Sequence, residues 1–156
     1  DLKRARGYFI EALEVANQAG LKREAGLAHS NIAEVSFFLG DLDHARMSAQ
    51  RALDVSAEFG GILPRIRGQA YLGVVRAQTG EATEGLAQLN DALKEARSLG
   101  DPRYIITILR LISLTPGSSA DNDDAGASSA RAEAVELADK YGIAHEIRLC
   151  RDLSDT

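Results

Sequence analysis

A glycine returns every forty residues along this chain, at Gly20, Gly60 and Gly100. The same register carries a recurring Ala-Leu pair, found at Ala12-Leu13, Ala52-Leu53 and Ala92-Leu93. A fixed period of this length is typical of stacked supersecondary units, each of which buries its apolar face against its neighbours. The period therefore favours a repeat scaffold over a globular enzyme core, and it leaves the bound partner open.

Each forty-residue unit is expected to contain two helices. Additional glycines at Gly40 and Gly80 divide the units, and the spacing of apolar residues by three and four predicts an amphipathic helix on each side. The expected helices span residues 22–39, 42–59, 66–79, 82–99 and 102–114.

The turns between these helices carry recognisable stop and start signals. Gly40-Asp41 and Gly100-Asp101 each combine a glycine that tolerates a left-handed helix end with an aspartate that can cap the next helix. Pro102 then stands at a first helical position, where its missing N–H is harmless. Gly80-Glu81 keeps the glycine without the ideal cap. Turns this short predict antiparallel helix pairs.

Composition limits the possible functions. The chain has 156 residues, 45% of them hydrophobic but only 5% aromatic, and its net charge of −5 gives no reason to expect nucleic-acid binding. A single cysteine, Cys150, excludes an internal disulfide and a multi-cysteine zinc site. No apolar run approaches the length of a bilayer span. Asp1-Leu2 corresponds to Asp41-Leu42 within the repeat, so a fragment cut inside a repeat is expected.

The repeat signature resembles the tetratricopeptide repeat family. The third unit has Tyr71-Leu72-Gly73, Gly80 and Ala92-Leu93, and the second has Ile32-Ala33, Gly40 and Ala52-Leu53, where the family has a Leu-Gly pair, a turn glycine and an Ala-Leu pair. The resemblance covers residues 1–142, although Ile112-Ser113 replaces the pair in the fourth unit. The family's usual period is about 34 residues, and the forty-residue version is similar to the repeats of kinesin light chains and of bacterial maltose-activator-type regulators.

The resemblance implies an all-α, right-handed superhelix of antiparallel helix pairs, an α-solenoid, in one domain over residues 1–156. A partial repeat at 1–20 would precede repeats at 21–60, 61–100 and 101–142, with an acidic flexible loop at 116–126 and a capping or truncated helix at 143–156. It further implies a non-catalytic, cytoplasmic interaction or sensor module of a larger signalling or transcriptional regulator. No cofactor or metal, no nucleic acid and no membrane are expected.

In such a superhelix the first helix of each pair lines a concave groove that binds a protein or peptide. Carried over by position, the groove residues are Leu27, Asn31, Glu34, Phe38, Arg67, Tyr71, Val74, Gln78, Thr107, Arg110, Leu111 and Leu114. Asn31 and Tyr71 would hydrogen-bond a peptide backbone, while Arg67 and Arg110 would fork onto a carboxylate. The alternative is that the apolar members pack between helices and the arginines are solvated. The family's carboxylate-clamp pattern is not reproduced.

Signals for catalysis or metal binding are weak. His29, His44 and His145 stand without a second ligand at metal spacing, and Cys150 has no neighbouring base. The segment 121–126 resembles the start of a calcium loop, but Ala125 and Ala132 occupy positions that need oxygen ligands. The chain is therefore not expected to be an enzyme.

Two classes of function remain open. The first is a protein- or peptide-binding module that works through the groove. The second is a structural segment that self-associates, as a homodimer through the solenoid ends, with Leu2, Phe9 and Leu153 at the contact.

Overall fold

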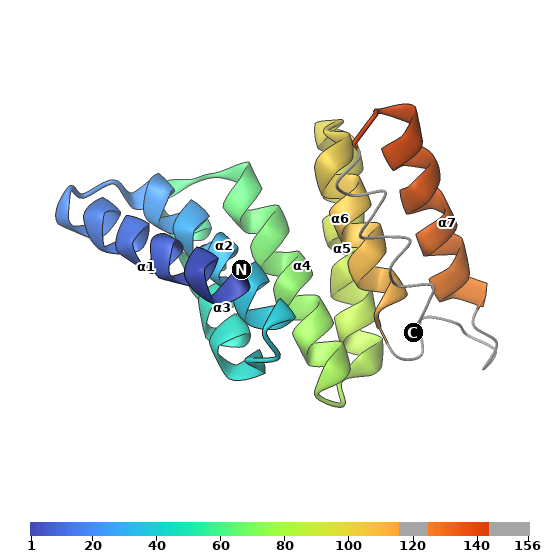
Figure 1. Ribbon diagram of the computed structural model, residues 1–156, viewed down its shortest axis with the longest axis horizontal. Helices are drawn as coiled ribbons and strands as arrows, with labels where there is room; N and C mark the ends of the chain where they lie inside the picture. The colour runs from blue at the N-terminus through green and yellow to red at the C-terminus, as the bar shows by residue number, and fades with distance from the viewer. Residues whose placement is uncertain (116–124, 144–156) are drawn as a thin grey trace. The chain divides into compact units, whose positions relative to one another are not determined.

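The structure is a computed structural model that describes residues 1–115 and 125–143, and these residues contain helices and no strand (Figure 1). The helices are α1 (Leu2–Gln18), α2 (Lys22–Phe38), α3 (Leu42–Phe59), α4 (Ile62–Gln78), α5 (Ala82–Leu99), α6 (Pro102–Ser113) and α7 (Ala125–Lys140). The expected all-α class is confirmed for this part of the chain.

Most helix boundaries agree with the sequence to within one residue. The exception is α4, which begins at Ile62 and not at residue 66, because Pro64 lies in its first turn. Backbone N–H groups of a first turn have no partner inside the helix, so proline removes no helical hydrogen bond there. The expected loop at 116–126 lies mostly outside the described residues, and its last two residues begin α7. The expected helix at 143–156 lies outside them from residue 144 onward.

The turn chemistry predicted from glycine and aspartate is confirmed at two turns. Gly40 and Gly100 both have φ of 76°, the left-handed region that glycine favours. The Asp41 side chain accepts a hydrogen bond from the backbone N–H of His44, and the Asp101 side chain accepts one from that of Arg103. These bonds satisfy donors that the helix itself leaves unpaired.

The structure divides into two compact units, Asp1–Val75 and Arg76–Thr156. In the first unit α2 packs against both α1 and α3. Small residues permit close approach: a Cβ added at Gly68 of α4 would lie 3.0 Å from the backbone oxygen of Ala49 in α3. Alanines at the centre of this unit, Ala33, Ala45 and Ala52, are fully buried. Close alanine and glycine contacts therefore replace a large aromatic core here.

In the second unit α6 packs against both α5 and α7. Its interior is aliphatic, and the residues with no exposed surface include Leu89, Ile106 and Leu111. At the surface, Nη2 of Arg97 in α5 donates to Oε1 of Glu133 in α7 at 2.6 Å. Among the described helices of the chain, none is long and apolar enough to span a membrane.

Candidate binding surface on helices α2 and α4

Three residues that the sequence placed in a groove come together in the first unit. Arg67 of α4 donates from Nη1 to Oδ1 of Asn31 at 2.5 Å, and from Nη2 to Oε2 of Glu34, both in α2. The Arg67 side chain is 17% exposed and that of Glu34 is 31% exposed. Asn31, Glu34 and Arg67 therefore form a polar cluster, partly buried, that bridges the first helices of two successive pairs.

The polar cluster changes what Arg67 can do. Its guanidinium already donates hydrogen bonds to an amide oxygen and to a carboxylate of the same chain, so its charge is already partly neutralised before any ligand binds. The bonds occupy the carbonyl oxygen of Asn31 and one oxygen of Glu34, which leaves the Asn31 amide hydrogens and the second Glu34 oxygen for other partners. This arrangement presents both donors and acceptors, as needed for contact with a peptide backbone.

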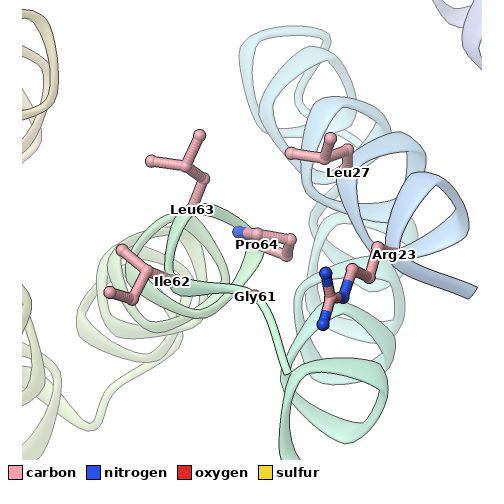
Figure 2. Close-up of a pocket in the computed structure, with 6 residues that line it drawn as sticks. All are labelled: Arg23, Leu27, Gly61, Ile62, Leu63 and Pro64. Atoms are coloured by element: carbon pink, nitrogen blue, oxygen red, sulfur yellow. The ribbon is translucent and has the colours of Figure 1, made fainter. Parts of the chain in front are cut away.

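An apolar hollow lies one helical turn before the polar cluster. Figure 2 shows Arg23 and Leu27 of α2 facing the first turn of α4 across it. Its volume is about 170 Å³, and its lining is formed by Arg23, Leu27, Gly61, Ile62, Leu63 and Pro64. An apolar cavity of about 150 Å³ is large enough for benzene. The apolar hollow therefore has room for one apolar side chain.

Two basic side chains, Lys22 and Arg23, lie in the first turn of α2, and Arg23 lines the apolar hollow. Nε of Arg23 donates to the backbone oxygen of Phe59 at 3.3 Å, which fixes the guanidinium beside the end of α3. Nζ of Lys22 lies 5.7 Å from the centre of the Phe59 ring, within the range of a cation–π contact. Leu27 and Phe59 are 37% and 38% exposed. An apolar surface with a basic edge thus occurs in a chain of net charge −5.

The aromatic residues of the predicted groove have different positions. Phe38 is 37% exposed and its ring packs edge-on against Phe37, with 5.2 Å between centroids. Tyr71 is fully buried with its ring 6.1 Å from that of Phe37, and Val74 is fully buried too. In the structure, then, Phe38 lies at the surface, whereas Tyr71 and Val74 belong to the interior. Gln78 is exposed at the end of α4.

The remaining predicted groove residues lie on α6 in the second unit. Arg110 is only 4% exposed and Leu111 is fully buried, while Thr107 and Leu114 are half-buried. The Thr107 hydroxyl donates to the backbone oxygen of Arg103 at 2.8 Å. Arg67 and Arg110 thus belong to different units.

The sequence reasoning missed five residues of the apolar hollow: Arg23, Gly61, Ile62, Leu63 and Pro64. The last three were missed because α4 was expected to begin at residue 66. A proline two residues after Ile62 is compatible with a first helical turn, and this signal would have extended the helix backward. Gly61, with φ of 121°, marks the true break before α4.

His29, Asp41 and Asp101, which lie outside this surface, have shifted pKa values. Burial lowers the pKa of the half-buried His29, and the positive charge of Arg51 lowers it further. The side-chain hydrogen bond with His44 lowers the pKa of Asp41, and that with Arg103 lowers the pKa of Asp101. Within residues 1–115 and 125–143, no three His, Cys, Asp or Glu side chains gather as a metal site. His145, Cys150 and Asp121–Asp124 lie outside the described residues.

Comparison with known proteins gives no match, either to a family model or to a curated protein.

Proposed function

We propose that this chain is a non-catalytic protein- or peptide-binding module built as a tetratricopeptide-like, right-handed solenoid. The observation that carries the proposal is the adjacency of the apolar hollow and the polar cluster on α2 and α4. A binding surface needs an apolar anchor and groups that fix the ligand's orientation, and here both lie on neighbouring helical turns.

The surface is continuous along one stripe of α2. Arg23, Leu27, Asn31, Glu34 and Phe38 are spaced by three or four residues, so their side chains leave the helix on the same side. At about 1.5 Å per residue the stripe is roughly 22 Å long. Its length suits a segment of several residues and exceeds what a small metabolite would contact.

Charge and shape favour a particular class of segment. An apolar side chain would fill the apolar hollow, and an acidic group beside it would meet Arg23 and Lys22. Farther along, the polar groups of Asn31 and Glu34 would pair with the segment's backbone. We therefore propose an acidic segment with an apolar anchor as the ligand. Its binding would serve as the sensor or interaction step of a larger cytoplasmic regulator.

The proposal is tested by selecting peptides from a random display library and measuring their dissociation constants by fluorescence polarisation. Leu27→Ala and Arg23→Ala should each weaken the best peptide by roughly five- to thirty-fold, as expected for residues at the centre of an interface. Arg67→Ala should do the same by releasing Asn31 and Glu34, and added salt should weaken binding.

Matched controls come from the other unit. Leu99 of α5 is 40% exposed and Lys94 is exposed, so Leu99→Ala and Lys94→Ala remove the same kinds of side chain elsewhere. Circular dichroism of each variant would check that it is folded. Peptides that bind equally well to all five variants would place the binding surface elsewhere, and a library without binders would contradict a peptide-binding function.

A further inference from the structure

The polar cluster on α2 and α4 offers a fixed set of hydrogen-bonding atoms. A guanidinium has five N–H donors and no acceptor, so the atom of Asn31 that faces Arg67 has to be its carbonyl oxygen. The contact has this form, with Nη1 of Arg67 donating to Oδ1 of Asn31 at 2.5 Å. The amide nitrogen of Asn31, with both its hydrogens, is therefore the atom left for another partner.

Glu34 contributes an acceptor beside that donor. Nη2 of Arg67 donates to Oε2 of Glu34, and the Glu34 side chain is 31% exposed against 17% for that of Arg67. The second carboxylate oxygen, Oε1, takes no part in this bond and can accept another hydrogen bond. The more buried arginine thus holds a carboxylate that keeps one oxygen for an outside partner.

The spacing of Asn31 and Glu34 suits the backbone of an extended segment. Three residues apart on a helix, their Cβ atoms lie about 5–6 Å from each other. An extended residue presents its N–H and its C=O on the same side, as when paired strands exchange two hydrogen bonds. A helical segment uses these groups internally, except at its ends. The donor of Asn31 and the acceptor of Glu34 therefore match an extended backbone and not the side of a helix.

A neutral donor fits Glu34 better than a charged one. Arg67 already supplies this carboxylate with a positive charge. A lysine of the bound segment would bring a second cation close to the guanidinium, and like charges repel at such a distance. A backbone N–H completes the hydrogen bonding of the carboxylate without that repulsion.

We propose that Glu34 accepts a hydrogen bond from one backbone N–H of the bound segment, which lies extended across the polar cluster. Arg67 is the residue that positions Glu34 for this bond. The bond rests on the peptide-binding function proposed above, and it adds the conformation of the segment and one position at which an N–H is required. Proline has no backbone N–H, so it is excluded from that position.

Fluorescence polarisation with the tightest-binding peptide from the display library tests the bond. The peptide is synthesised as a series in which one backbone N–H at a time carries a methyl group instead of its hydrogen. On the wild-type chain, methylation at the position that meets Glu34 should weaken binding at least tenfold, because a hydrogen bond to a charged group is lost.

The decisive quantity is the ratio of the dissociation constants of the methylated and parent peptides. A methyl group also weakens binding by its bulk, and Glu34→Ala also leaves Arg67 without its carboxylate, so a single affinity does not isolate the bond. The ratio on each variant does isolate it, as in a double-mutant cycle. At the position that meets Glu34, Glu34→Ala should reduce the ratio to about threefold or less.

The positioning role of Arg67 is measured with the same ratio. Arg67→Met should lower it, because nothing then holds the carboxylate, and Arg67→Lys, which keeps a cationic donor, should retain more of it. Glu133→Ala is the matched control. Glu133 of α7 pairs with Arg97 at 2.6 Å, so this substitution removes the same kind of ion pair in the other unit and should leave the ratio at its wild-type value.

The outcomes separate this bond from the proposed function. Equal ratios on the wild-type chain and on Glu34→Ala at every position would overturn the bond, while binding that still depends on Arg23 and Leu27 would uphold the peptide-binding function. A peptide that NMR shows to be helical when bound would overturn it as well. A chain that binds no library peptide would contradict the peptide-binding function itself, and the bond with it.

Discussion

Gly68 in α4 and Gly7 in α1 differ in how closely other atoms approach the position of a Cβ. A Cβ at Gly68 would lie 3.0 Å from the backbone oxygen of Ala49 and 3.1 Å from Cγ of Leu53, whereas one at Gly7 would meet nothing within 4 Å. Gly68 is therefore required by packing between α4 and α3, and Gly7 is not.

Substitution of these glycines should have opposite effects. Gly68→Ala should destabilise the first unit by about 1–3 kcal/mol, because a backbone atom cannot rotate away from the added methyl group. Gly7→Ala should stabilise it by about 0.4–1 kcal/mol by reducing the freedom of the unfolded chain. Urea unfolding followed by circular dichroism measures both, and equal effects of the two substitutions would contradict the packing of α4 on α3.

His29 makes stability depend on pH. Burial holds its pKa in the folded chain below the ordinary value of 6.5. As pH falls below 6.5, the unfolded chain takes up a proton that the folded chain resists, so folding becomes less favourable. The loss continues until the pH reaches the folded-state pKa, below which both states are protonated.

The free energy of unfolding of the wild-type chain should therefore fall more between pH 7.5 and 5.5 than that of His29→Gln, which cannot titrate. Subtracting the two urea-unfolding series removes the contribution of groups common to both chains. A wild-type chain that loses no more stability than the variant would show that His29 is not held neutral by the fold.

The beginning of α6 depends on one side chain. Asp101 accepts a hydrogen bond from the backbone N–H of Arg103 at 3.0 Å and receives a second bond at 2.7 Å from Nη2 of the same residue. Asp101→Ala should destabilise the second unit by about 1 kcal/mol, the usual effect of removing an N-cap. Asp101→Asn keeps an acceptor and should lose less, and equal losses in thermal unfolding would rule out a capping role.

Helix positions were predictable because the signals that set them are local. Glycine and aspartate at residues 40–41 and 100–101 determine where helices stop and start, and both turns form as expected. The start of α4 was missed because Pro64 is a helix breaker in most positions and harmless only in a first turn.

The candidate site was less predictable than the helices. Position in the repeat placed Asn31, Glu34 and Arg67 on two facing helices, and the structure brings them together. Position in the repeat did not show that Arg67 pairs with Glu34, because the pairing depends on the distance between α2 and α4, which the sequence does not give. Position in the repeat also did not predict that Phe38 is exposed and Tyr71 buried. Burial depends on packing against residues that are far apart in the sequence.

Among the described residues, helices α2, α4 and α6 begin forty residues apart, and the exposed surface differs from one of these helices to the next. On α2 and α4 that surface combines the apolar hollow with the polar cluster. The surface on α2 and α4 is the one proposed to bind a peptide.

The most direct test of the central proposal is to map backbone amide NMR shifts while a selected acidic peptide with an apolar anchor is added to the chain. A binding module that works through α2 and α4 predicts the largest shifts at residues near Arg23, Leu27, Asn31 and Arg67, with α7 unchanged. Shifts concentrated on α6 and α7, with none on α2, would contradict it.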